Sequence, residues 1–252
     1  MWRTKMKKKI VSAFAIVVVL AVVCAMPVVA QNKAPPEETG KVVYIPFPVK
    51  ITLDGKTDDW AGVPLQTVDR GPKKSPSPPE NGKFDFAVAA DETNLYVYMH
   101  TVDSNIIAGK HGKDTWNEDS MEFYLNLTKS LKASGYKTGI FQINISPTNI
   151  GKNNAPLAVT GTNAEKAKVT GSVFSTADGW AFEVAIPLES LKPEHGTTIG
   201  FQAHANGATK KDRDSKLIWS LADRADQSYQ NPALFGKGVF FKVGSTDVPK
   251  AQ

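Results

Sequence analysis

A strict alternation of apolar and polar residues runs through residues 121–127. Met, Phe and Leu occupy one set of positions, whereas Glu122, Tyr124 and Asn126 occupy the other. This period of two predicts a β-strand with one face in a core. Its second face carries a carboxylate, a phenol and a carboxamide, which hydrogen-bond in fixed directions and can read a polar ligand. Trp116 lies just upstream among acidic and polar residues, so its indole either is partly exposed or caps the core.

The same period recurs in short segments bounded by Gly, Pro, Asn or Asp. The expected strands are 84–90, 95–102, 121–127, 139–146, 168–175, 179–187, 198–206, 216–220 and 238–243. Residues 42–53 predict an edge strand, because Pro46 and Pro48 lack amide donors. Only residues 188–191 suggest a helical turn. The pattern predicts an all-β fold: a single antiparallel β-sandwich of jelly-roll or immunoglobulin-like type, with little helix.

The faces turned away from the core are unusually rich in carboxamides. Alternation places Gln142 and Asn144, Gln202 and His204, and Glu183 outward on their strands, in addition to the acid of the first strand. Each amide offers a donor and an acceptor, which suits vicinal hydroxyls. An anionic ligand would call for Arg and Lys, which this predicted face lacks. The alternative is that these groups are solvated or satisfy one another.

The first thirty residues resemble a secretory signal peptide. A basic segment starting at Arg3 precedes the apolar residues 10–23, and small residues end the segment at Ala30, where we expect cleavage. Lipidation at Cys24 is an alternative, although Val23 is larger than a lipobox accepts. An uncleaved anchor is another, since the apolar run approaches the ~20 residues that span a bilayer.

The rest of the chain reads as one domain. Residues 31–41 are rich in Pro and Glu and predict a flexible tether, 42–245 the β-sandwich, and 246–252 a C-terminal tail. Trp60, after a turn, is expected to pack the N-terminal turn onto the core.

Removing the signal segment changes the charge and cysteine content. The chain has 30 basic and 25 acidic residues, and the surplus of five bases lies in that segment. The mature protein is formally neutral, so we expect no nucleic-acid partner and no specific membrane interaction after cleavage. The single cysteine also leaves with the signal, so no disulfide or thiolate is expected.

Catalytic chemistry has weaker support. Glu122 and Glu183 can serve as the acid and nucleophile of a glycosidase only if their carboxyls lie ~5 to 10 Å apart. The sequence contains no nucleophile elbow, zinc-protease motif or phosphate-binding glycine loop, and its four His show no metal-ligand spacing. A haem ligand at Met99 or His100 is the least favoured alternative, because Met99 fits a core position.

Two acidic clusters are candidates for a calcium ion, because loop carboxylates supply the oxygens that calcium binds. Solvated turns explain them equally well. The candidate ligands are Asp54, Asp58, Asp59, Asp114, Glu118 and Asp119.

An ordered series of motifs resembles the family 9 carbohydrate-binding modules, sugar-binding β-sandwiches found appended to xylanases. The similar segments cover about residues 51–243 and read I-T-L-D-G-K-T-D-D-W, L-Y-V-Y-M-H-T-V-D, W-N-E-D-S-M-E-F-Y-L-N, G-W-A-F-E-V-A-I-P-L, G-F-Q-A-H-A-N, D-R-D-S-K-L-I-W-S and Y-Q-N-P-A-L-F-G. No single block is very specific; their order is.

The resemblance implies that two aromatic side chains sandwich a terminal sugar ring while polar groups bind its hydroxyls. By motif, the aromatics correspond to Trp116 and Tyr229, where the family tends to have Trp at the second position. The corresponding polar residues are Glu122, Gln142 and Gln202, with Asp226 or Asn231 beside Tyr229. Asn144 and His204 are further candidates from the alternation. The family also implies a structural calcium ion, and no other cofactor.

These observations predict an exported, secreted or periplasmic protein that binds sugars or the ends of plant-type polysaccharides such as xylan, and that does not catalyse a reaction. The ligand is the expected partner, and a monomer is the expected state. The alternatives are a glycoside hydrolase or hydrolase-associated protein acting on xylan or cellulose, a structural cell-surface domain, and a haem-binding β-sandwich.

Overall fold

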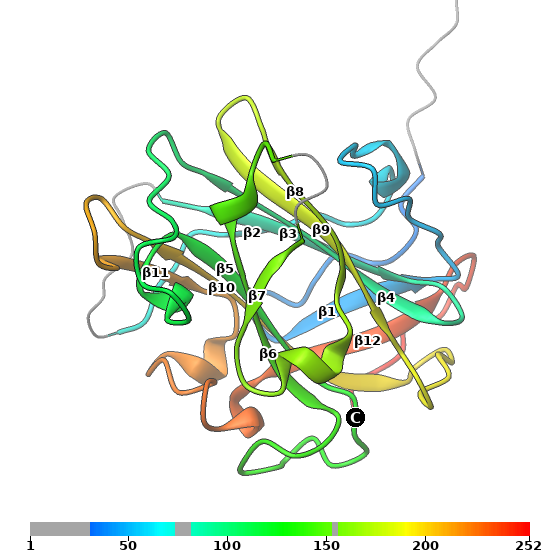
Figure 1. The fold of residues 1–252 in the computed structure, drawn as a ribbon. Helices are drawn as coiled ribbons and strands as arrows, with labels where there is room; N and C mark the ends of the chain where they lie inside the picture. The colour runs from blue at the N-terminus through cyan, green and yellow to red at the C-terminus, as the bar shows by residue number, and fades with distance from the viewer. Residues whose placement is uncertain (1–30, 74–81, 153–155) are drawn as a thin grey trace, which may run out of the picture.

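The computed structural model describes residues 31–73, 82–152 and 156–252, which form two packed β-sheets (Figure 1). The seven-stranded sheet has the order β1, β12, β10, β5, β6 and β7, with β11 also paired to β10. Its strands are β1 (Val42–Phe47), β5 (Ser120–Asn126), β6 (Ile140–Ser146), β7 (Ala158–Thr160), β10 (Thr198–Gly207), β11 (Ser215–Ile218) and β12 (Gly236–Lys242).

The second sheet has five strands in the order β2, β3, β4, β9 and β8. They are β2 (Gln66–Val68), β3 (Phe84–Ala90), β4 (Asn94–Val102), β8 (Thr170–Ser175) and β9 (Gly179–Pro187). Helical structure in the described residues is confined to short 3-10 turns, η1 (Asp58–Trp60), η2 (Thr115–Asn117), η3 (Pro147–Asn149), η4 (Ala164–Ala167), η5 (Leu221–Asp223) and η6 (Pro232–Leu234).

The predicted all-β sandwich is confirmed, with three local differences. β1 is an edge strand as expected, but it ends at Phe47, and its pairing with β12 is parallel. The short strands β2 and β7 were not predicted, because three residues are too few to show an alternation. Residues 188–191 form a hydrogen-bonded turn and no helix.

The apolar faces of the two sheets meet in a common core. Phe86 of β3 stacks on Phe201 of β10 with ring centroids 5.5 Å apart, and Phe123 of β5 lies 6.0 Å from Phe182 of β9. Each pair joins one sheet to the other. Because side chains alternate along a strand, the same strands place their polar residues on the two outer faces.

A second apolar cluster closes the outer face of the five-stranded sheet. Trp60, only 7% exposed, packs there with Val49, Ile51 and Tyr96. Its indole Nε1 donates to Glu183 Oε2 over 3.4 Å. The expected packing role of Trp60 is therefore what the structure shows.

Residues 31–41, which the sequence predicts to be a flexible tether, make specific contacts with the domain. Ala34 is buried, the Trp219 indole donates to Glu37 Oε2 over 2.6 Å, and the Leu221 amide donates to the Gly40 carbonyl. The expected signal segment, residues 1–30, lies outside the described residues. Among the residues that the structure describes, no helix is long and apolar enough to cross a membrane.

Candidate functional site

The polar outward positions of three neighbouring strands form one continuous patch. In the sheet register, Glu122 of β5 faces Asn144 of β6 on one side and His204 of β10 on the other. Tyr124 faces Gln142 and Gln202 in the same way. The alternation in the sequence thus assigned these side chains to one face correctly, except for Glu183, which lies on the outer face of the other sheet.

A cleft of about 630 Å³ opens over this patch, between η2 and the segment of residues 219–235 that joins β11 to β12. Trp116 from η2 and Tyr229 from that segment line it, and they are 43% and 48% exposed. The other lining residues are Glu122, Tyr124, Gln142, Thr162, Arg213, Lys216, Ala225, Asp226 and Gln227.

Trp116 has the Arg213 guanidinium packed over its ring. The guanidinium carbon lies 5.1 Å from the centroid of the indole, and the Arg213 amide donates to the Asn117 carbonyl over 2.9 Å. A guanidinium at this distance is attracted to the π-face. One indole face is therefore fixed by the protein, while the side chain as a whole stays nearly half exposed.

Glu122 lies at the bottom of the cleft and is 1% exposed. Its Oε2 accepts from the Tyr124 hydroxyl over 2.6 Å and from Gln142 Nε2 over 2.9 Å, and its Oε1 accepts from Asn206 Nδ2 over 2.7 Å. The Lys216 ammonium lies 3.5 Å from Oε1. A carboxylate has about four acceptor sites, so Glu122 is fully satisfied without a ligand.

The charge of Glu122 is stabilised despite its burial. Burial by itself raises the pKa of this carboxyl, but the charge of Lys216 and the bonds from Tyr124 and Asn206 outweigh it and hold the pKa well below its usual value. Glu122 therefore remains ionised and anchors Lys216.

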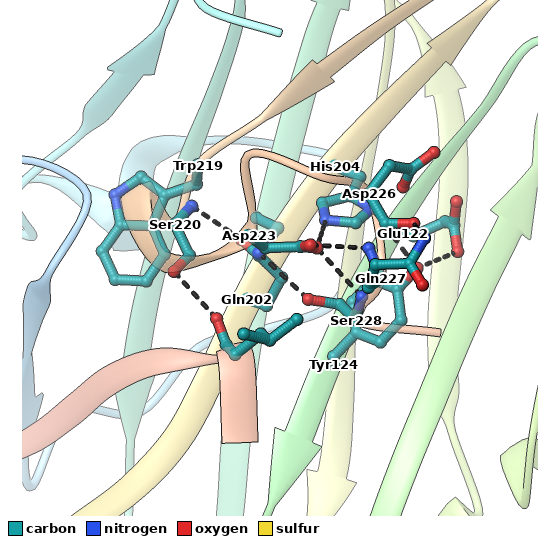
Figure 2. Close-up of polar contacts among 12 residues, drawn as sticks. Glu122, Tyr124, Gln202, His204, Trp219, Ser220, Asp223, Asp226, Gln227 and Ser228 are labelled. Carbon is teal, nitrogen blue, oxygen red and sulfur yellow. Dashed lines mark hydrogen bonds and ion pairs between the residues drawn. The ribbon is translucent and has the colours of Figure 1, made fainter. Parts of the chain in front are cut away.

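Below the cleft, a polar network fixes residues 219–235 to β10 (Figure 2). Gln202 Oε1 accepts from the amides of Ala203 and Ser220, each over 2.9 Å, and its Nε2 donates to Ser228 Oγ. Asp223 accepts from the amides of Gln227 and Ser228 over 2.6 and 3.0 Å. Since these groups are buried and paired, their main role is to position the segment that carries Asp226 and Tyr229.

The structure divides the predicted ligand residues into two groups. Trp116, Glu122, Gln142, Asp226 and Tyr229 line the cleft. The other four do not. Gln202 and His204 lie fully buried behind it, Asn144 accepts from the Thr115 hydroxyl, and Asn231 caps η6 by accepting from the Ala233 amide.

Two basic cleft residues were missed by the sequence analysis. Lys216 and Arg213 lie on the face that was expected to lack Lys and Arg, and both pair with Asp226 there. Lys216 Nζ is 2.8 Å from Asp226 Oδ1, and Arg213 Nη2 is 4.0 Å from Oδ2. β11 has only four residues, too few for alternation to assign Lys216 to a face. The motif D-R-D-S-K, which follows the β10 sequence, contains both residues and was the feature of the sequence that could have identified them.

Four of the six acidic candidates for calcium serve other partners, and the remaining two are exposed. Glu118 accepts from the amides of Gly109 and Lys110, and Asp119 from those of Ile107 and Ala208. Asp59 accepts from the Thr52 amide, and Asp54 pairs with Lys56, whereas Asp58 and Asp114 are exposed. None of the six belongs to a convergent group of three possible ligands in the described residues. Calcium stays a prediction of the family resemblance.

The enzyme and haem alternatives fit the geometry poorly. Glu122 and Glu183 lie on the outer faces of different sheets with the core between them. Packed sheets are ~10 Å apart, so carboxyls on their far sides exceed the separation that a glycosidase pair needs. Met99 is fully buried in the core, and His100 is paired with Asp85 and Asp178.

Comparison with known proteins shows what the chain is similar to. Residues 53–242 match the model of the family described as "Carbohydrate family 9 binding domain-like". Endo-1,4-beta-xylanase A of Thermotoga neapolitana is 27% identical over 188 residues, and endo-1,4-beta-xylanase C of Paenibacillus barcinonensis is 26% identical over 194 residues. These matches cover 73% and 76% of this chain but only 16% of each xylanase.

Two solved structures share the fold. Both are carbohydrate-binding modules of family 9 from Caldicellulosiruptor kristjanssonii, one in complex with cellotriose and one with glucose. The TM-scores are 0.66 and 0.64 at 22% sequence identity. The matches cover 84% and 82% of this chain, and 100% and 99% of the two modules.

Proposed function

The chain belongs to the carbohydrate family 9 binding domain-like family, and we propose that it is a non-catalytic protein that binds sugars in the cleft between Trp116 and Tyr229. The observation that carries this proposal is the pair of half-exposed aromatic side chains on the walls of a cleft with a polar floor. A pyranose presents flat C–H faces to aromatic rings and hydroxyls at its rim, and the cleft offers partners for both.

The polar contacts divide between accessible and supporting groups. Gln142, Asp226 and Arg213 are partly exposed in the cleft and can meet hydroxyls directly. Glu122 already accepts from three donors besides the nearby ammonium, so it reaches a hydroxyl only where that hydroxyl replaces the Gln142 amide. We assign Glu122 mainly to holding Lys216 and Tyr124 in place.

The ligand class follows from the relatives. Matching regions occur in xylanases, and the two structural neighbours were solved with cellotriose and glucose. We propose that this chain binds cello- or xylo-oligosaccharides. We also propose that it acts outside the cytoplasm, with residues 1–30 as its signal segment.

The direct test is calorimetric titration of the protein with cellotriose, glucose and xylotriose. Trp116→Ala should weaken binding of the preferred sugar at least about tenfold, since stacking contributes ~1 kcal/mol beyond the buried area. Leu65→Ala is the matched control, because Leu65 is also exposed, at 57%, but precedes β2 on the other sheet. Equal affinities for the wild type and Trp116→Ala would refute the proposed site.

A second assay separates binding from hydrolysis. We expect no release of reducing ends from xylan or cello-oligosaccharides by the wild-type protein. Hydrolysis that disappears in Glu122→Gln or Glu183→Gln would overturn the non-catalytic assignment.

A further inference from the structure

A histidine and two aspartates converge beneath the sugar cleft. His204, Asp223 and Asp226 each offer one ligand atom, and these atoms lie within 4.8 Å of one another. His204 and Asp223 are fully buried, and Asp226 also lines the cleft. Within residues 31–73, 82–152 and 156–252 this is the one group of three His, Cys, Asp or Glu residues that converges in this way.

The hydrogen bonds around His204 determine where its protons lie. The Tyr124 hydroxyl is 2.6 Å from Glu122 Oε2, and an ionised carboxylate only accepts, so the tyrosine proton points to Glu122. The Tyr124 oxygen is also 3.3 Å from His204 Nδ1, which must therefore carry a proton and donate it. With the proton on Nδ1, Nε2 is the ring nitrogen that can offer a lone pair to a metal ion.

That lone pair faces a carboxylate in a fully buried position. His204 Nε2 has no hydrogen-bond partner, and the closest acid oxygen, Asp223 Oδ2, lies 3.5 Å away. Two facing lone pairs require a cation between them. A proton would bring the two atoms to ~2.8 Å, whereas two ligands of a tetrahedral Zn²⁺ at ~2.1 Å each lie about 3.4 Å apart. The observed separation matches the second case.

The surrounding groups meet two further requirements of a metal site. His204 Nδ1 donates its proton to the Tyr124 oxygen, and both oxygens of Asp223 accept backbone amides. Metal ligands in proteins are usually oriented by such additional hydrogen bonds. The local charge also leaves room for a cation. Glu122, Asp223 and Asp226 are acidic, whereas only Lys216 and Arg213 are basic neighbours.

From this geometry we propose that His204, Asp223 and Asp226 form a binding site for a divalent transition-metal ion, with Zn²⁺ as the best fit. One imidazole nitrogen and two carboxylates suit Zn²⁺, whereas calcium prefers oxygen ligands alone. Asp226 is shared with Lys216, whose ammonium lies 2.8 Å from Oδ1. The ion would tie residues 219–235 to β10 and would join the cleft through Asp226.

The experiment titrates EDTA-treated, dialysed protein with Zn²⁺ in the absence of sugar, so its result does not depend on the proposed function. Calorimetry should show one ion per chain. His204→Gln and Asp223→Asn should each weaken binding at least about tenfold. His100→Gln is the matched control, since Asp85 and Asp178 lie on opposite nitrogens of its ring and cannot converge. Equal binding by the wild type and His204→Gln would overturn the site.

A second measurement on the wild type does not depend on whether the variants fold. Co²⁺ in place of Zn²⁺ should give the intense visible bands of a four-coordinate N/O site, and Zn²⁺ should remove them. In ¹⁵N NMR, Zn²⁺ should shift the Nε2 resonance of His204. A His204 Nε2 that carries a proton and does not respond to Zn²⁺ would show that the gap holds a proton, which contradicts the proposal.

Discussion

The two outer faces of the sandwich carry the same pair of residue types in opposite settings. On the five-stranded sheet, Glu183 lies under Trp60, and residues 49–63 cover both in an apolar cluster. On the seven-stranded sheet, Glu122 lies near Trp116 beneath an open cleft. Burial raises the pKa of Glu183, whereas the nearby Lys216 ammonium lowers the pKa of Glu122. A buried glutamate therefore becomes a structural acceptor or a permanent anion according to whether a cation is supplied.

The comparison also shows how one face remains available to a ligand. Trp60 is 7% exposed because a long segment packs on it, whereas Trp116, which has Arg213 over its ring, is still 43% exposed. In our proposal, identical side chains thus serve stability on one face and sugar recognition on the other. Each prediction below tests one side of that contrast.

The largest effect should follow Trp60→Ala. Removing a buried indole from its contacts with Tyr98 and the rest of the apolar cluster should lower the free energy of unfolding by about 3–5 kcal/mol. Urea denaturation followed by fluorescence measures this change. At a temperature where the variant is folded, its sugar affinity should match the wild type. A loss of sugar affinity equal to that of Trp116→Ala would contradict the assignment of Trp60 to stability alone.

The next effect compares two isosteric substitutions. Glu122→Gln removes the anion beside the buried Lys216 and should cost about 3 kcal/mol of unfolding free energy, because it breaks a buried ion pair. Glu183→Gln keeps one acceptor for the Gly55 amide and removes a charge that burial disfavours, which partly offsets the lost bond from the Trp60 indole, so its cost should be smaller, about 1 kcal/mol. Equal losses in denaturation experiments would mean that the cation makes no difference.

A smaller effect is expected from the second aromatic wall. Tyr229→Ala should weaken sugar binding by about 1 kcal/mol, roughly fivefold, with little change in stability because the side chain is 48% exposed. Tyr229→Trp should keep or raise affinity through its larger ring. Calorimetric titration measures both variants. If Tyr229→Ala binds as the wild type does, the stacking surface consists of Trp116 alone.

The smallest effect is on the pH dependence of the unfolding free energy. It tests whether a buried acid on the same side of the protein as Glu122, but without a paired cation, has a raised pKa. Asp119, next to β5, is buried like Glu122, but burial, aided by the charge of Asp103 and opposed by two amides, raises its pKa to about 7. In the unfolded chain the pKa is ~3.9, so the folded protein binds the extra proton and unfolding free energy falls as pH rises through 7. With EGTA present, we expect a loss of about 1 kcal/mol between pH 5.5 and 8.5, allowing for solvent screening.

The control for this prediction is Asp103→Asn. Removing the neighbouring charge should flatten the pH dependence of thermal unfolding measured over the same range. A wild-type profile that rises with pH would contradict the direction assigned to Asp119.

Alternation was sufficient to predict the sandwich and the strand residues on the floor of its cleft, whereas the aromatic walls were assigned through the family resemblance. It places Glu122 and Gln142 outward whatever their environment, and the sheet register then brings them together. It gave no information on depth: Gln202 and His204 share the same face but lie beneath residues 219–235. Whether an outward side chain meets solvent depends on a loop whose path is set by contacts distant in sequence.

The residues that the sequence did not assign correctly were missed for a similar physical reason. Lys216 belongs to a strand too short to show a period, and Asp223 follows no pattern that marks it as the partner of His204. Glu183 was grouped with Glu122 because alternation does not reveal which of two sheets a strand joins. These assignments require strand order, which only tertiary pairing supplies.

The parallel pairing of β1 with β12 has a consequence for the order in which the protein folds. These strands are nearly 200 residues apart, with Val42 opposite Lys237 and Phe47 opposite Lys242. During synthesis from the amino end, β1 has no partner until almost the whole chain has been made. Contacts of such sequence separation form slowly, because a long loop must close first. The unpaired β1 contains Pro46, which lacks an amide donor. This makes β1 a poor template for intermolecular strand pairing before β12 is synthesised.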